Sequence, residues 1–421
     1  MIVDILHFSS STANVLSSGM SDSNQHFSEF KPHSKHKHLI LREYFLAWGH
    51  KLGLRTGAGD KILYVDACAG RGRDDVGNHG SPLIAAVAAA VAQDSVSERR
   101  STPFKIHVVA IEANRAYVEE LSALLSPFGD TVTVVHGTLG ELASELETQY
   151  PKTPRLTFID PFGLDPLKAD VVRDALRGDR SEALLLFADQ AALRHFGAIA
   201  AEETRAERRH REAADPLPLF PGLEPTGLDE LAQAATLSRN ALEMTRASAM
   251  RIMTTAFGDD AWYQQIESAA PNDRRRTLID LYSSRLRSWG ALYTLRVPIV
   301  DASGTHAYTL IHASRQAKAY RTMKEAVTYA LKHSPLPAEV VEKMRHLVSS
   351  DLAAAERAIR REFAGRTVRW TEDPKDPSAE CVRDFALENT EAYPFEFDEL
   401  KERLRPLRLP GQSIVYTFPP E

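Results

Sequence analysis

The residues best suited to chemistry lie where an apolar run ends in glycines. Residues 62–72 read Ile-Leu-Tyr-Val-Asp-Ala-Cys-Ala-Gly-Arg-Gly. The β-branched and apolar part is typical of a buried parallel strand, and the small residues after Asp66 are typical of a tight turn. Backbone N–H groups can approach a ligand closely at such a turn, because no side chain blocks them. The pattern therefore predicts a binding site for a nucleotide-bearing cofactor.

The residues after the turn discriminate between cofactors. A phosphate-binding P-loop requires Lys and then Ser or Thr after its second glycine, whereas Arg73 and Asp74 follow Gly72. A dinucleotide-binding turn requires a third glycine three residues after the second, and Asp75 stands there. The small-residue pattern favours S-adenosylmethionine, whose charged methionine end could meet the carboxylate of Asp66.

An acidic residue at the end of the next strand supports the same cofactor. Glu112 ends the run Val-Val-Ala-Ile-Glu, where its carboxylate could accept both ribose hydroxyls. Thr138, after the third strand, could either accept a hydrogen bond from the adenine amine or cap the following helix. The predicted cofactor-binding residues are Asp66, Ala67, Cys68, Gly70, Gly72, Glu112 and Thr138.

A second carboxylate follows another apolar strand, in Thr-Phe-Ile-Asp-Pro-Phe-Gly at residues 157–163. In enzymes that methylate amino groups, a carboxylate or amide here and the carbonyl beside the proline accept hydrogens from an exocyclic amine, while an aromatic ring stacks on the base. Those enzymes carry Asp-Pro-Pro before the aromatic residue, so Phe162 comes one position early. We predict that Asp160, Pro161 and Phe162 are catalytic. The alternative is that Asp160 only binds the cofactor or caps the next helix.

Three further residues are predicted to bind the substrate, namely Lys37, Ser81 and Gly163. Ser81 precedes Pro82, which is acceptable at a first helical position because its missing N–H would be unpaired there. Ser81 could therefore cap that helix or contact the substrate.

Alternating strands and helices are expected to position these residues. Parallel strands are predicted at 61–66, 106–111, 132–136, 155–160 and 183–188, and an antiparallel pair at 291–300 and 306–313. Helical patterns cover 37–54, 82–92, 114–126, 139–149, 166–176, 273–288 and 315–332. Ligands of such sheets bind at the carboxyl ends of the strands. The predicted fold is α/β, with the Rossmann-like sheet of class I methyltransferases, in which a terminal antiparallel hairpin finishes the parallel strands.

The chain divides into four predicted parts. Residues 1–30, rich in Ser and Asn, are expected to form a mobile tail, and residues 31–193 and 261–333 the methyltransferase-like domain. A charged and helix-prone insertion at 194–260 would recognise a partner or substrate. Residues 334–421 are expected to form a C-terminal α+β module that could be winged-helix-like.

Composition and cysteine content limit the class of protein and its expected location. The 421 residues are 43% hydrophobic and carry a net charge of −6. The two cysteines, Cys68 and Cys381, cannot build a disulfide framework or a metal site by themselves, which favours a reducing, cytoplasmic location. No apolar stretch approaches the length of a bilayer span, so no membrane association is expected.

Three basic stretches, at 31–38, 205–211 and 274–276, could together line a groove that tracks phosphates of a nucleic acid. Each stretch alone is more often a solvated helical face. The histidines at 33–38 lack a companion cysteine or acidic ligand at metal spacing, so no metal site is predicted.

Ordered motifs over about residues 30–335 resemble the three-Cys-motif partner proteins. These motifs are His33-Ser-Lys-His-Lys37-His-Leu, Tyr64-Val-Asp66-Ala-Cys-Ala-Gly70-Arg-Gly72, Gly80-Ser81-Pro82-Leu83, Ile111-Glu112, Phe158-Ile-Asp160-Pro-Phe-Gly163 and Ser314 followed by Met323-Lys324. The resemblance implies a methyltransferase-like fold and an association with a three-cysteine, iron–sulfur protein of radical-cofactor type. Cys68, where an aromatic residue is more usual, and Thr138 depart from the pattern.

Two functions follow as expectations. The first is an S-adenosylmethionine-dependent methyltransferase that acts on an amino group of a nucleic acid base or nucleotide, alongside the three-cysteine partner. The second is a non-catalytic accessory subunit that keeps the fold and docks the partner through residues 194–260. Methyl transfer needs positioning more than acid–base power, so the lack of a nucleophile–histidine pair does not argue against the first.

Overall fold

The computed structural model describes most of the chain between residues 29 and 418. The described ranges are 29–55, 61–100, 103–161, 163–200, 246–371, 379–405, 407–408 and 414–418. Residues 1–28 of the predicted N-terminal tail, residues 201–245 of the predicted insertion and Phe162 lie outside the described residues.

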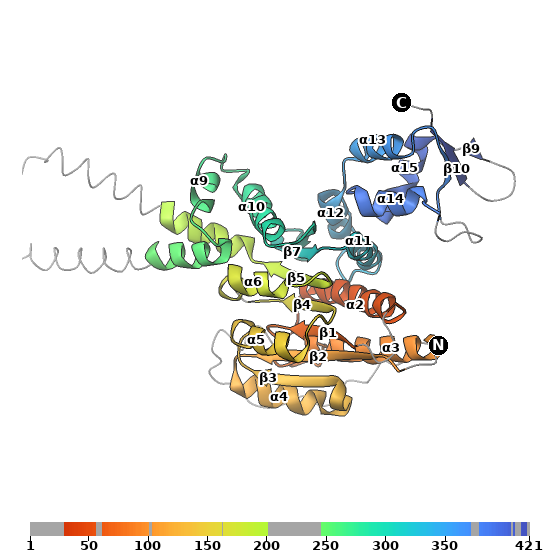
Figure 1. The fold of residues 1–421 in the computed structure, drawn as a ribbon. Helices are drawn as coiled ribbons and strands as arrows, with labels where there is room; N and C mark the ends of the chain where they lie inside the picture. Colours follow the sequence, from red (N-terminus) through yellow and green to blue (C-terminus); the bar gives the residue numbers. More distant parts are fainter. Residues whose placement is uncertain are drawn as a thin grey trace, which may run out of the picture.

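A seven-stranded sheet forms the centre of the molecule, in the order β3-β2-β1-β4-β5-β7-β6 (Figure 1). Its strands are β1 (Lys61–Asp66), β2 (Lys105–Glu112), β3 (Val132–His136), β4 (Arg155–Ile159), β5 (Ser181–Phe187), β6 (Tyr293–Val300) and β7 (His306–Ser314). The first five strands are parallel, whereas β7 is antiparallel to both β5 and β6. The predicted parallel sheet with a terminal hairpin is confirmed, with strand ends shifted by one or two residues.

Helices cover both faces of this sheet. One core contains buried residues of α2 (Pro32–Gly53), α3 (Ser81–Arg100), α11 (Ala317–Lys332) and α12 (Ala338–Val348). The opposite core contains residues of α5 (Leu139–Gln149), α6 (Ala169–Ala175), α9 (Trp262–Glu267) and α10 (Arg274–Ser288). A smaller cluster joins α4 (Arg115–Leu125) to α3 and β2. Short 3-10 helices lie at Ser126–Thr131, Asp165–Leu167 and Pro394–Glu396.

The described ends of the predicted insertion belong to the main domain. Residues 189–200 and 246–257 are helical. Phe196, Met253 and Phe257 are buried in the core beside β5 and α10. Because these apolar faces are covered by the sheet's own core, the boundaries expected at 194 and 260 do not separate two structural units.

The C-terminal module begins later than expected, because α12 packs in the main core through Val340 and Met344. The module consists of α13 (Leu352–Glu362), β8 (Thr367–Arg369), α14 (Val382–Asn389), α15 (Phe397–Leu404), β9 (Leu407–Arg408) and β10 (Ile414–Thr417). Its antiparallel sheet has the order β8-β10-β9. The order of helices and strands in this module, drawn in blue in Figure 1, is compatible with the winged helix, which stays a prediction. Its separate core is centred on Phe363, Trp370 and Tyr416.

A buried lysine joins the module to the main domain. The Lys324 ammonium on α11 donates hydrogen bonds to the carbonyls of Leu387 (2.9 Å) and Thr390 (2.5 Å), at the end of α14. It also lies 4.2 Å from the centre of the Tyr320 ring. A cation at a helix C-terminus is favoured by the helix dipole and pairs carbonyls that would otherwise be buried without donors.

Candidate functional site

The turn after β1 requires glycine at two positions. Gly70 and Gly72 adopt positive φ angles of 62° and 79°, which favour glycine. A Cβ atom on Gly72 would lie 2.6 Å from Leu124 and 2.7 Å from Leu121. The turn is closed by a hydrogen bond from the Gly80 N–H to the Gly72 carbonyl, 2.8 Å long. The local geometry therefore confirms the predicted tight turn, in which Gly72 packs against α4 without room for a side chain of its own.

A cavity of about 1170 Å³ opens at the carboxyl ends of the parallel strands. It is larger than the range of about 300–1,000 Å³ common for a single small-molecule site, so it could hold a cofactor and an acceptor group together. Of the predicted site residues, those that line this cavity are Lys37, Ala67, Cys68, Gly70, Gly72, Ser81, Glu112, Thr138, Asp160, Pro161 and Gly163. Residues from four strand ends, from α2 and from the start of α3 thus meet in one place.

The carboxylate of Glu112 is held rigidly in this cavity. One oxygen accepts a hydrogen bond from the Gly70 N–H, and the other accepts one from the Asn114 N–H, each 2.7 Å long. A carboxylate oxygen has a second lone pair, so both oxygens can still accept a hydroxyl. Glu112 therefore links the glycine turn to the end of β2 and fits the predicted contact with a ribose.

Asp66 differs from the other predicted cofactor residues, because it is fully buried and does not line the cavity. Burial raises its pKa to about 7, although a hydrogen bond from the Ser81 hydroxyl lowers it. Its Oδ1 atom has no hydrogen-bond partner among the described residues. Asp66 lies beneath the turn, so it would affect a bound ligand only indirectly, by positioning Ser81 or the backbone of the turn.

Ser81 does not cap the helix as the sequence suggested. It is the first residue of α3, and the Gly80 carbonyl accepts the first helical hydrogen bond from the Ile84 N–H (3.0 Å). The Ser81 hydroxyl donates a hydrogen bond to the buried carboxylate of Asp66. Ser81 also lines the cavity, so the predicted substrate contact stays a prediction.

Thr138 caps a helix and lines the cavity at the same time. Its side chain accepts from the Glu141 N–H (3.4 Å), and the Glu141 carboxylate accepts from the Thr138 N–H (2.8 Å), which forms a capping box for α5. The capping alternative is thus realised. A contact with adenine is compatible with it but is not required to explain this residue.

The acceptor half of the cavity is centred on a buried ion pair. The Lys37 ammonium, on the second turn of α2, pairs with the Asp160 carboxylate at the end of β4. The Lys37 side chain is 7% exposed and the Asp160 side chain 19%. The same ammonium lies 5.9 Å from the centre of the Tyr308 ring, which also lines the cavity. The two side chains expected to serve substrate and catalysis therefore act as one unit.

Cys68 lies among the three carboxylates of the site. Burial raises the pKa of its thiol above the ordinary range, and the charges of Asp66, Asp160 and Glu112 raise it further. A thiol held protonated in this way is a poor nucleophile. Cys68 therefore acts through its shape and backbone and not as a covalent catalyst.

Several cavity residues were not found from the sequence. They are Tyr117 on α4, Gln190, Arg194 and His195 on the helix at 189–200, and Tyr308 on β7. Burial and the nearby charge of Asp160 raise the pKa of the Tyr308 hydroxyl, so Tyr308 lies near Asp160. A β-bulge precedes it, since Val300 pairs with His306 while Ile299 pairs with Tyr308. Bulges alter the direction of neighbouring side chains, so strand alternation alone does not predict which residues face the cavity.

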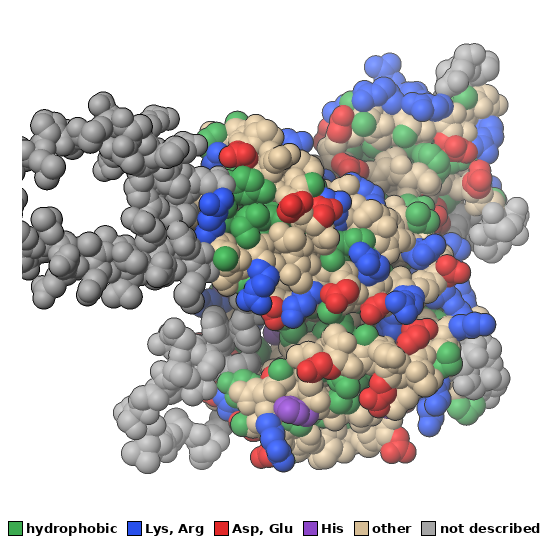
Figure 2. Space-filling model, turned by 60° about the vertical axis from the view of Figure 1, so that its left-hand side comes forward, with side chains coloured by type: hydrophobic (Ala, Val, Ile, Leu, Met, Phe, Trp, Pro, Cys, Tyr) green, Lys and Arg blue, Asp and Glu red, His purple; other side chains and the backbone are tan. Residues whose placement is uncertain are grey.

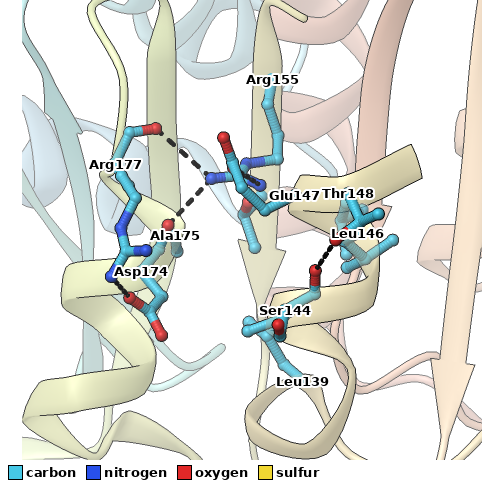
Figure 3. A pocket seen from close by; sticks show the side chains of 12 residues that line it. Leu139, Ser144, Leu146, Glu147, Thr148, Arg155, Asp174, Ala175 and Arg177 are labelled. Carbon is cyan, nitrogen blue, oxygen red and sulfur yellow. Dashed lines mark hydrogen bonds and ion pairs between the residues drawn. The ribbon is translucent and has the colours of Figure 1, made fainter. Parts of the chain in front are cut away.

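A second, smaller cavity of about 220 Å³ lies between α5 and α6 (Figure 3). The Arg155 guanidinium reaches the carbonyls of Asp174 (2.8 Å) and Arg177 (3.4 Å). The acidic side chain of Glu147 lies 3.6 Å from the same guanidinium. Because Arg155 pairs the last carbonyls of α6, its role is to hold this helix end against β4.

The three basic stretches are only partly described, so the groove that they could line stays a prediction. On the face in Figure 2, acidic and basic side chains lie interspersed. In the stretch 274–276, Arg276 pairs with Asp280 (3.8 Å) and Arg275 lies 4.0 Å from the buried Asp189. The stretch 205–211 lies outside the described residues.

Among the residues the structure describes, no three His, Cys, Asp or Glu side chains gather at a metal-binding distance. No helix in the described ranges is both long and apolar enough to cross a bilayer.

Comparison with models of protein families finds no match, and neither does comparison with curated proteins. Solved methyltransferase structures resemble the chain weakly. A protein assigned as an O-methyltransferase from Klebsiella pneumoniae is 14% identical, with a TM-score of 0.30 over 65% of this chain and 80% of that chain. Loganic acid methyltransferase, solved with SAH, is 11% identical, with a TM-score of 0.27 over 71% and 98% of the two chains. Geranyl diphosphate C-methyltransferase from Streptomyces coelicolor A3(2) is 13% identical, with a TM-score of 0.21 over 64% and 80%.

TM-scores this low support no conclusion about activity, and they say nothing about the three-Cys-motif partner family. The fold is assigned from the strand order. Five parallel strands are followed by an antiparallel β7 inserted between β5 and β6, and the cavity lies at the carboxyl ends of the strands. The chain thus has the Rossmann-like fold of class I methyltransferases.

Proposed function

We propose that this protein is an S-adenosylmethionine-dependent methyltransferase that acts on an amino group of a nucleic acid base or nucleotide. One observation carries the proposal: apart from the buried Asp66 and the undescribed Phe162, the predicted cofactor and acceptor residues line one cavity, with Glu112 fixed by the N–H of Gly70. The fit rests on the Glu112 carboxylate, which keeps free lone pairs beside the positive-φ glycines of the turn.

In this proposal, Glu112 holds the ribose, the turn at Gly70 and Gly72 lies against the methionine part, and Thr138 lies near the base. When bound, S-adenosylmethionine supplies an electrophilic methyl group. The protein's part is to align the acceptor amine with that group and to exclude water. The Asp160 carboxylate and the Pro161 carbonyl accept hydrogen bonds from the two N–H groups of the amine. The nitrogen lone pair then points toward the methyl group.

The ion pair also favours a neutral acceptor. Because Lys37 compensates the charge of Asp160, the pair does not select a protonated aliphatic amine such as that of a lysine side chain. An exocyclic base amine is uncharged and suits this environment. Tyr308 offers an aromatic ring for stacking on the base, which is the role expected of Phe162 in the sequence.

The test is transfer of labelled methyl groups from S-adenosylmethionine to separate pools of DNA, RNA, tRNA and protein. Label in a nucleic acid pool, lost with Asp160→Ala, is the expected result. Label only in protein would refute the choice of acceptor, and equal transfer by Asp160→Ala would refute its role.

The accessory-subunit function stands as a second candidate, since the proposed catalytic carboxylate of Asp160 is already neutralised by Lys37. Docking of a three-cysteine iron–sulfur partner rests on the family resemblance alone. Intact partner function with Asp160→Ala, in the absence of any methyl transfer, would favour this candidate.

A further inference from the structure

The Lys37–Asp160 pair offers two kinds of hydrogen-bonding group side by side. An ionised carboxylate only accepts hydrogen bonds, whereas an ammonium has three N–H donors and no acceptor. The pair with Asp160 uses one of those donors. Both residues line the acceptor half of the cavity, so a ligand there meets an acceptor at Asp160 and a donor at Lys37.

A ligand that satisfies both groups must carry an N–H donor next to an unprotonated acceptor. The amine-bearing side of adenine has this arrangement, with the exocyclic amine beside ring nitrogen N1, and cytosine has it with its amine beside N3. Guanine presents a protonated N1 next to its amine on the pairing edge, which would oppose the Lys37 ammonium. Its unprotonated N3 lies beside the amine only on the sugar side, where the sugar at N9 limits access. Enzymes that act on extruded bases read this edge by hydrogen bonds and stack the base on aromatic side chains.

Burial strengthens this discrimination. The Lys37 side chain is only 7% exposed. A ligand that covered the ammonium without accepting from one of its two remaining N–H donors would therefore lose binding free energy. The ring of Tyr308, beside the ammonium, gives the base a flat surface. His33 meets the same ring edge-on at a centroid distance of 5.8 Å and so limits its rotation.

We propose that the Lys37–Asp160 pair reads the acceptor base, with Asp160 accepting from the exocyclic amine and Lys37 donating to the adjacent ring nitrogen of adenine or cytosine. This inference rests on the proposed function and narrows its substrate class. Lys37 is then a specificity-determining residue and not merely a counter-ion of the carboxylate.

Deaza bases test the proposal without altering the protein. Oligonucleotides of thymine, or of uracil in the ribose series, carry a single adenine, 1-deazaadenine, cytosine, 3-deazacytosine or guanine. Transfer of labelled methyl from S-adenosylmethionine is measured for each. Loss of the ring nitrogen should lower kcat/KM by about tenfold or more, as expected for one hydrogen bond to a charged donor.

Two variants assign the effect to Lys37. With Lys37→Met, adenine and 1-deazaadenine, or cytosine and 3-deazacytosine, should react equally, because the donor that distinguishes them is gone. Lys35→Met, on the same helix but paired with Glu29 at 3.0 Å, should keep the full difference. Lys37→Arg should keep part of it, since a charged donor remains.

Three results would overturn the inference: equal rates for parent and deaza bases with the wild-type protein, methylation of guanine only, or no methylation of any test base although calorimetry shows that S-adenosylmethionine binds. Failure of S-adenosylmethionine to bind would instead refute the proposed function, and the inference would fall with it. The calorimetric measurement therefore separates the two failures.

Discussion

Replacement of Gly72 by alanine should damage the cofactor turn in two separable ways. The first is strain, because φ is +79° and a side chain in this region costs about 1–2 kcal/mol. The second is a clash, because the new Cβ would lie 2.6 Å and 2.7 Å from Leu124 and Leu121. Overpacking of this kind costs about 1–3 kcal/mol, so the total loss of unfolding free energy should be about 2–5 kcal/mol.

Gly77→Ala is the matched control, because Gly77 has a φ of +90° but nothing lies within 4 Å of its Cβ position. It should lose only the strain contribution of about 1–2 kcal/mol. Urea unfolding measures both losses, and calorimetry with S-adenosylmethionine should show weaker binding for Gly72→Ala alone. Equal destabilisation by the two substitutions would refute the argument that the turn is closed tightly against α4.

Three further predictions concern buried polar groups. Burial raises the pKa of Asp66 to about 7 from 3.8. The folded state therefore holds this proton more tightly than the unfolded state, and unfolding free energy should fall as pH rises from about 4 to 7. Asp66→Asn should flatten that fall in urea titrations, and an unchanged slope would contradict the assignment. Tyr44→Phe removes a donor from the buried carboxylate of Glu182 and should cost about 1–3 kcal/mol of unfolding free energy, whereas a loss near zero would show that the hydroxyl is dispensable. Lys324→Met leaves two carbonyls at the end of α14 without their donor, so amide exchange there should become faster, and unchanged exchange would show that the lysine does not hold the module.

Local signals predicted the glycine turn after β1 and the acidic end of β2, both of which lie at the cavity. Residues 62–65, before Asp66, are apolar and buried, and the glycines at 70 and 72 occupy positions of positive φ. Glu112 ends the next strand and lies beside β1 through parallel pairing. These features follow from runs of fewer than a dozen residues, together with the rule that parallel strands carry their ligands at the carboxyl ends.

The acceptor half depends on contacts that no local pattern encodes. Lys37 and Asp160 are 123 residues apart in the chain and meet only because α2 packs across the sheet. Tyr308 faces the cavity after a bulge whose presence depends on the pairing of β6 with β7. The boundary before α12 was misplaced for a similar reason, since its amphipathic pattern does not reveal which core it covers.

The proposed function requires S-adenosylmethionine to occupy the cavity with its ribose at Glu112. Calorimetric titration of the wild-type protein should show one binding site, and Glu112→Ala should weaken binding by about tenfold or more, since hydrogen bonds to a charged group are lost. Glu119→Ala, on the exposed face of α4, should bind as the wild type does. Absence of binding to the wild-type protein, or equal affinity of the Glu112→Ala variant, would contradict the central claim.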